Sequence, residues 1–178
     1  MTNNHLDNII YKRANSIKDI KIITQANIND TLIDAVALER KREPILIHDN
    51  FEEIPQRFVN CLNENSYIRP HMHIIPKQWE LMSWLSGEII AFIFDVDGNS
   101  IQKIIMNEDN VKVIEIPPFC YHTFVAVTKG SYLEIRNCKY NPSVDRVYSS
   151  WSPLENSSLA ENYQKKFFTA KVGDKLVI

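Results

Sequence analysis

Between residues 66 and 137, short apolar runs alternate with residues that form turns. The breaks carry Gly, Pro, Asn or Asp, and Asp97-Gly98 between two apolar runs is a typical hairpin turn. The expected strands cover residues 66–73, 81–86, 88–95, 101–106, 111–116, 122–127 and 132–136. Strands this short, with turns at this density, predict a β-sandwich or barrel.

Two stretches before this region show helical spacing instead. In residues 29–42 and 51–63, apolar side chains recur every three or four positions, so each stretch predicts a helix with one buried face. Residues 20–24 predict a short strand in an otherwise loose arm. We therefore expect residues 1–63 to form an N-terminal arm with helices that pack on a barrel.

The chain beyond residue 140 leaves the strand pattern. Trp151 and Pro153 predict a cover over the barrel, and residues 159–168 predict a final helix. Residues 172–178 form a short apolar end that pairs either with an edge strand or with a partner chain. The expected organisation is one structural domain, with the barrel over residues 64–140 and the cover segment over 141–178.

Composition narrows the class of protein. With 178 residues, of which 44% are hydrophobic, the chain fits a single globular domain. A net charge of -2 without a basic stripe argues against a nucleic-acid partner. The three cysteines show no paired spacing, which favours a reducing compartment. No apolar run has the length of a membrane span or a signal peptide, so we expect a cytoplasmic protein.

The candidate chemistry centres on His71-Met72-His73. In a strand, side chains alternate between faces, so Arg69, His71 and His73 project to the same side. Two imidazoles on one face, with Glu80 shortly after and His122 downstream of a double proline, are typical of a divalent transition-metal site. The alternative is that the two histidines are simply half-exposed polar residues.

Two charged residues are candidates for substrate chemistry. Arg69 shares the histidine face, so it either holds an anionic substrate group or pairs with an acid such as Glu134. Glu134 lies on one face of the expected strand 132–136. It either faces the barrel lumen, where it is a candidate general base, or faces solvent.

Two further residues have alternative readings. Cys120 precedes His122 by two positions, so it either reaches the metal or fills space as a small buried side chain. His48 ends a short apolar run and has a structural or pocket role more naturally than a metal role, since three other histidines already fit the site.

These motifs together resemble the cupins, and more closely the WbuC family of cupin-fold metalloproteins. The histidine pair with Glu80 and Gly87 is similar to the first cupin motif, and Pro117 with His122 to the second. The resemblance covers roughly residues 40 to 156 and rests on residues 66–73, Trp79-Glu80, 94–98, 116–118, His122-Thr123, 140–142, Asp145-Arg146, 151–153 and Glu155.

The resemblance implies a cupin-type double-stranded β-helix, or jelly-roll barrel, that binds one divalent transition metal. Zn, Fe, Ni and Mn all suit the ligand set His71, His73, Glu80 and His122. The segment 74–78 is longer than in the family, which leaves Gln78 as an alternative to Glu80. Phe119 stands where cupins carry Gly, so we expect that turn to be built without a positive φ and the ring to narrow the pocket mouth.

The family resemblance also directs the functional hypotheses. Its members are often encoded with surface-polysaccharide (O-antigen) genes, which implies a small substrate such as a sugar or nucleotide sugar. The first hypothesis is an isomerase- or epimerase-like metalloenzyme, with Glu134 and Arg69 as catalytic candidates. The second is a cupin-type metal-dependent dioxygenase, and the third a non-catalytic metal or carbohydrate binding module. Many cupins pair through sheet edges, so a homodimer is expected.

Overall fold

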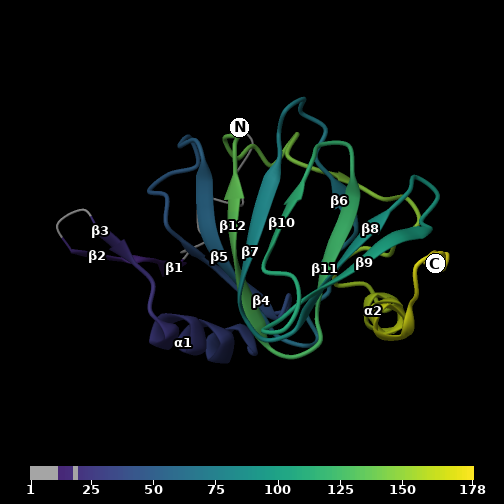
Figure 1. Ribbon diagram of the computed structural model, residues 1–178, viewed down its shortest axis with the longest axis horizontal. Coiled ribbons are helices and arrows are strands. Elements are labelled where there is room, and N and C mark those ends of the chain that lie inside the picture. The colour runs from purple at the N-terminus through teal and green to yellow at the C-terminus, as the bar shows by residue number, and fades with distance from the viewer. Residues whose placement is uncertain (1–11, 18–19) are drawn as a thin grey trace.

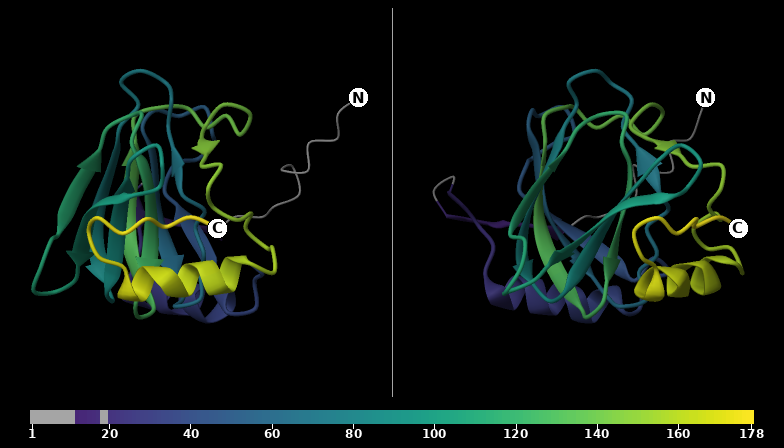
Figure 2. Two further views of the ribbon diagram at one scale, coloured as in Figure 1. Left: turned by 90° about the vertical axis from the view of Figure 1, so that its right-hand side faces the viewer. Right: turned by 45° about the vertical axis from the view of Figure 1, so that its right-hand side comes forward.

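Two sheets, antiparallel except for the parallel pairing of one edge strand, face each other as a barrel, and one helix lies outside each sheet (Figure 1). The computed structural model describes residues 12–17 and 20–178, so much of the expected N-terminal arm lies outside the described residues. Figure 2 shows the strands arranged around a common axis, with the C-terminal helix against one side. Among the described residues, no helix has the length and apolar character needed to cross a membrane.

The strands of the barrel fall into two sheets. The first contains, in spatial order, β1 (Lys12–Arg13), β4 (Arg42–Leu46), β5 (Gln56–Leu62), β12 (Gly130–Arg136), β7 (Glu80–Ser86) and β10 (Val113–Ile116). The second contains β13 (Val147–Tyr148), β6 (His71–Met72), β11 (Tyr121–Ala126), β8 (Ile89–Phe94) and β9 (Ser100–Met106). A separate hairpin joins β2 (Asn15–Ile17) to β3 (Ile20–Ile22).

The order of the strands is that of a jelly roll. From β5 to β12, the chain crosses from one sheet to the other at every step except the β8–β9 hairpin. This places β5-β12-β7-β10 opposite β6-β11-β8-β9. Such a double sheet buries one face of each sheet against the other. The predicted all-β jelly-roll core is therefore confirmed.

The strand β8 shows why the core has two layers. All six of its residues are buried, because one face points between the sheets and the other points outward under a helix. Ile89, Ala91 and Ile93 join the core between the sheets. The alternate residues, such as Phe92, pack against α2 (Ala160–Thr169). Burial on both faces explains the uninterrupted apolar run in the sequence.

The inward faces of the strands change from apolar to polar along the barrel axis. On β12, Tyr132 lies in the core, whereas Glu134 and Arg136 on the same face line a cavity. The antiparallel partner β7 follows the same order in reverse, since Arg136 lies opposite Glu80 in the register. The barrel is therefore closed by hydrophobic side chains at one end and carries its ionisable groups at the other.

The predicted helix over residues 51–63 is wrong, because this stretch contains the strand β5. Val59 and Cys61 pack beneath the first helix, while Phe58 and Asn60 face the cavity. With apolar residues on both faces, the strand shows no clear alternation and resembles a helical pattern. The barrel sheet therefore includes β4 and β5, and the expected boundary between residues 63 and 64 falls inside it.

The two observed helices cover opposite sheets. The predicted helix over 29–42 is observed as α1 (Gln25–Ala35), so it begins and ends earlier than expected. It begins at Gln25 because the Thr24 hydroxyl accepts a hydrogen bond from the Asn27 backbone and caps the helix. The final helix, α2, agrees with the prediction to within a residue. The C-terminal end then runs beside the β8–β9 turn, where the Leu176 amide donates to the Gly98 carbonyl at 2.8 Å.

Replacing Gly87 with Ala should lower the free energy of unfolding by about 3 kcal/mol or more. Gly87 has φ +75, and an added Cβ would lie 2.6 Å from Gly130 Cα and against the Lys129 carbonyl oxygen. Left-handed backbone costs a non-glycine residue about 1–2 kcal/mol, and the clash adds to this. Chemical denaturation followed by circular dichroism measures the change.

Gly173→Ala is the matched control for this substitution. Gly173 also has a positive φ, at +96, but a Cβ there meets no atom within 4 Å. We expect a loss of only about 1 kcal/mol. Equal losses at both positions would show that the close approach of Gly87 to β12 contributes nothing.

Candidate metal centre

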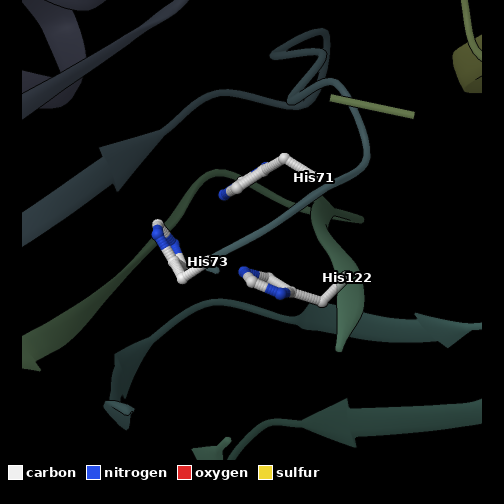
Figure 3. A group of neighbouring side chains, drawn as sticks. All are labelled: His71, His73 and His122. Atoms are coloured by element: carbon white, nitrogen blue, oxygen red, sulfur yellow. The ribbon is translucent and has the colours of Figure 1, made fainter. Parts of the chain in front are cut away.

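Three histidines from two adjacent strands converge on one point (Figure 3). His71 lies on β6 and His73 follows it with one residue between, so the extended backbone directs both rings to the same side. His122 lies on β11 directly opposite His71 in the antiparallel register. All three side chains are buried, and one nitrogen from each lies within 4.8 Å of the others.

The backbone fixes the orientation of each imidazole ring. Every Nδ1 lies within hydrogen-bond distance of a backbone carbonyl oxygen, which requires the Nδ1 proton and leaves the lone pair on Nε2. The pairs are His71 with Arg69 at 2.9 Å, His73 with Asp145 at 2.5 Å and His122 with Cys120 at 2.9 Å. Each of the three rings is thus fixed by its Nδ1 edge.

Glu80 completes the group from the opposite sheet. Its carboxylate oxygens lie 2.8 Å from His73 Nε2 and 3.1 Å from His122 Nε2. Two ligand atoms that each bind a metal at about 2.1 Å, at roughly a right angle, lie about 3.0 Å apart. The spacing is therefore that of neighbouring ligands around one ion. Gln78, the alternative, instead directs its amide to Cys138 Sγ at 3.0 Å.

A buried arginine holds the carboxylate in its ionised form. Arg136 Nε lies 2.9 Å from Glu80, and its Nη2 donates to Asp145. Burial raises the pKa of Glu80, but the adjoining His122 and His73 side chains and the charge of Arg136 together hold it well below its usual range. Because Asp145 also accepts from His73 through its backbone, one network orients two ligands.

The residues fit a divalent transition metal. His73 Nε2 is buried and makes no hydrogen bond with good geometry, although Glu80 lies beside it. Burial, followed by the charge of Arg146, lowers the pKa of His71 well below its usual value, so that ring is neutral. Lone pairs and a carboxylate facing one another in a buried site repel unless a cation lies between them. Three imidazoles and one carboxylate suit such an ion.

A cavity of about 160 Å³ adjoins this group inside the barrel. Its wall combines aromatic and apolar side chains with polar and charged ones, and His71, Glu80 and His122 form part of it. Other residues of the wall include His48, Phe58, Asn60, Phe124, Tyr132, Glu134, Arg136 and Arg146. Neither Arg69 nor Phe119 lines the cavity.

Glu134 faces the lumen, not solvent. It is buried, and Asn60 Nδ2 donates to its Oε2 at 2.6 Å. Burial and the nearby charge of Glu80 raise the pKa of Glu134 to about 8. A carboxyl group with this pKa exchanges protons near neutral pH, which keeps Glu134 as a general-base candidate.

Arg69 does neither of the two things expected of it. Its guanidinium donates to the Ser149 carbonyl at 2.7 Å and to Ser152 Oγ at 3.3 Å, and lies over the Tyr148 ring. The backbone direction of Arg69 agrees with the histidines, but the C-terminal cover segment binds its long side chain outside the cavity. The role assigned to Arg69 from the sequence therefore has no support in the cavity geometry.

The turn before His122 differs from the expectation. Phe119 adopts φ +64, although a positive φ was not expected for a bulky residue. Phe119 is 59% exposed, so its side chain is not part of the packed core. Its backbone amide donates a hydrogen bond to the His73 carbonyl at 2.7 Å. That hydrogen bond offsets a backbone cost of about 1–2 kcal/mol. A positive φ after Pro118 is what a type II turn requires.

Cys120 and His48 lie apart from the metal ligands. Cys120 packs against the core and a surface groove between β9 and β10, which agrees with the space-filling alternative. His48 lines the cavity, and its Nδ1 lies 3.0 Å from the Arg57 amide. Its role is in the pocket wall, as preferred from the sequence.

Three functional residues were not assigned a role from the sequence. Arg136 shares a strand face with Glu134, a signal that was present but not used. Asp145 and Arg146 were noticed only as part of the family resemblance. They reach the site because the loop after β12 folds back across the mouth of the barrel, and no local pattern indicates this.

The comparisons with known proteins address the fold. A family model described as a domain of unknown function, DUF6016, matches residues 23–106. No curated protein matches the sequence. The capsular polysaccharide assembling protein CapF from Staphylococcus aureus is similar in structure, with a TM-score of 0.50 at 18% identity over 60% of this chain. The match covers 28% of the CapF chain, so this chain spans less than a third of that relative.

Two further solved structures show weaker similarity. An RmlC-like cupin from Shewanella frigidimarina has a TM-score of 0.44 at 13% identity, over 57% of this chain and 79% of its own. The salicylate 1,2-dioxygenase from Pseudoaminobacter salicylatoxidans has a TM-score of 0.49 at 8% identity, over 65% and 33%.

The jelly-roll order, closed at one end by a hydrophobic core, together with the similarity to CapF decides the architecture. The fold is that of a cupin. Within this cupin, the histidine group lies between the sheets, at the polar end of the barrel. The narrower resemblance to the WbuC family stays a prediction.

In this cupin, Glu80→Gln should weaken metal binding by about 10- to 100-fold, because an amide oxygen replaces a charged ligand. Gln78→Ala, the control two residues away, should leave the affinity within a factor of about three, since the Gln78 amide reaches Cys138 Sγ and the Nδ1 edge of His73, 3.5 Å away, but not the centre of the group. Competition with a chromophoric chelator measures both constants. The reverse ranking would make Gln78 the ligand.

Glu134→Gln should change how the stability of the metal-free cupin depends on pH. The folded-state pKa of Glu134, about 8, lies above its ordinary value of 4.5, so the stability present below pH 4.5 is lost as pH rises through 8. The melting temperature of the variant should therefore gain on that of the wild type between pH 5 and 8.5. Parallel melting curves across this range would contradict the raised pKa.

Proposed function

We propose that this cupin binds one divalent transition metal through His71, His73, Glu80 and His122 and acts on a small sugar-derived substrate as an isomerase- or epimerase-like enzyme. The observation that carries the proposal is the convergence of three Nε2 atoms whose Nδ1 atoms are all held by backbone carbonyls. Such second contacts are typical of metal-binding histidines.

The setting in surface-polysaccharide synthesis rests on the resemblance to the WbuC family. The structural neighbour CapF is itself a capsular polysaccharide assembling protein. The proposed cytoplasmic location rests on the unpaired cysteine spacing and the short apolar runs of the sequence. The proposed homodimer rests on the edge pairing that is common among cupins, and sedimentation velocity measures it.

The proposed chemistry divides between the ion and the cavity wall. When bound, a divalent ion supplies Lewis acidity toward a carbonyl or hydroxyl oxygen. Glu134, with its pKa raised to about 8, takes a proton from carbon or oxygen and returns it. Asn60 holds one oxygen of that carboxyl group in place by its hydrogen bond to Oε2. Phe58, Phe124 and Tyr132 form the apolar wall that limits access of water.

The metal content of protein purified without added metal tests the first half of the proposal. We expect close to one equivalent in the wild type and none in a His71→Ala, His73→Ala double variant, because two of four ligands are lost. His48→Ala is the matched control, since this histidine lines the same cavity outside the group and should keep the metal. Undiminished metal in the double variant would remove the site.

Solvent exchange tests the second half. The metal-loaded protein is incubated in deuterium oxide with a panel of sugars, sugar phosphates and nucleotide sugars, and proton NMR follows loss of the signal next to the carbonyl or at the epimerised carbon. Exchange that depends on Glu134 supports the proposal. Bound iron with oxygen uptake would indicate a dioxygenase instead, and tight metal binding without turnover a binding module.

A further inference from the structure

Four arginines contribute to the cavity wall, and three of them are already engaged. Arg136 contacts Glu80 and Asp145, and is only 2% exposed. Arg42 donates to both oxygens of Glu155 and to the Tyr67 carbonyl. Their guanidinium groups stabilise the protein and have little capacity left for a ligand.

The third arginine, Arg40, marks the outer rim. Its side chain is 54% exposed, and its Nε lies 3.2 Å from Glu155. An arginine this exposed is screened by water and salt, so it attracts a ligand only weakly. Arg40 adds positive charge at the opening of the cavity but does not form a specific binding site there.

Arg146 is different, because it keeps donors for a ligand. Its Nε donates to Asp145 Oδ2 at 3.1 Å, which anchors the guanidinium at one edge. Among the residues that the structure describes, none forms a hydrogen bond with either Nη atom of Arg146. The side chain is 26% exposed and lines the cavity together with His71 and His122. The planar group therefore presents N–H donors beside the candidate metal centre, which suits an oxyanion.

The charge of the cavity favours the same kind of ligand. With every carboxyl group ionised, the four guanidinium groups are balanced by four carboxylates: Glu80, Glu134, Asp145 and Glu155. A bound divalent ion then leaves an excess of two positive charges, or of three while Glu134 keeps its proton. A buried excess of this sign attracts and stabilises a negatively charged substrate.

The volume limits the size of the buried part. A cavity of about 160 Å³ is close to the size that encloses one six-membered ring. A single monosaccharide-sized unit fits inside, and any larger group must extend past Arg40 at the rim.

We propose that the substrate of this cavity is a small anion, a carboxylate or phosphate ester of about monosaccharide size, and that Arg146 binds its negatively charged group beside the metal centre. This rests on the proposed function and deepens it by naming the substrate class. Arg146 takes the part that the sequence assigned to Arg69.

Matched ligands of one ring type test the proposal. Isothermal titration calorimetry is run on the metal-loaded protein with glucose, glucuronate, glucose 6-phosphate and inorganic phosphate as probes. We expect at least one anionic probe to bind ten-fold or more tightly than glucose, with affinity that falls as salt is added. The stronger of glucuronate and glucose 6-phosphate identifies the carboxylate or the phosphate as the recognised group. Equal affinity for glucose and the anions, or no anion binding at millimolar concentration, would overturn it.

Variants then assign the effect to Arg146. Arg146→Gln should lose the preference for the anion at least ten-fold, and Arg146→Lys should keep part of it because the charge remains. Arg57→Gln is the matched control, since Arg57 pairs with Glu53 at the surface and does not line the cavity. An unchanged preference in folded Arg146→Gln would refute the assignment.

The metal content of each sample separates the two proposals. Anion binding that depends on Arg146 in a protein without metal would refute the proposed function alone. A fully loaded wild-type protein that binds glucose as well as its anionic analogues would refute this inference alone.

Discussion

The site depends on the repulsion among groups that the barrel forces together. Three imidazole rings and an ionised carboxylate meet in a buried space. Lone pairs that face one another there cannot satisfy one another, and each remaining buried acceptor costs free energy. A cation at the centre would accept these lone pairs, and the free energy of unsatisfied acceptors would then favour metal binding. The positive charge of Arg136 beside Glu80 keeps this carboxylate ionised, and Arg136 does not occupy the position between the three histidines.

The jelly roll brings these groups together through register. His122 lies opposite His71 across one sheet, and Arg136 lies opposite Glu80 across the other. Because strand side chains alternate with a period of two, a slip of one residue in either pair would turn the ligands out of the barrel. The apolar residues further along the same strands resist such a slip, since Met82 and Phe124 would leave the core with it. Packing at one end of the barrel thus fixes the chemistry at the other.

The loop after β12 connects the histidine group to the cavity. Asp145 holds His73 through its backbone carbonyl and two arginines through its carboxylate. One of those arginines supports Glu80, and the other faces the cavity. A single residue therefore couples the orientation of His73 to the position of two guanidinium groups.

The sequence alone determined the parts of this protein that follow from local periodicity. The alternation of short apolar runs with turns predicted the strands, and the spacing of His71 and His73 with the later His122 predicted the ligands, because a strand places every second side chain on one face. Only the tertiary structure decided what depends on both faces of an element or on a long side chain. Residues 51–63 form a strand because α1 covers one face and the cavity the other. Arg69 lies outside the cavity because the C-terminal segment binds its guanidinium, and Arg146 lines the cavity because the loop after β12 brings it there. The position of a long, flexible side chain depends on the groups that it contacts. The partner of Arg69 is the Ser149 carbonyl, 80 residues away, and local sequence patterns do not predict such a contact.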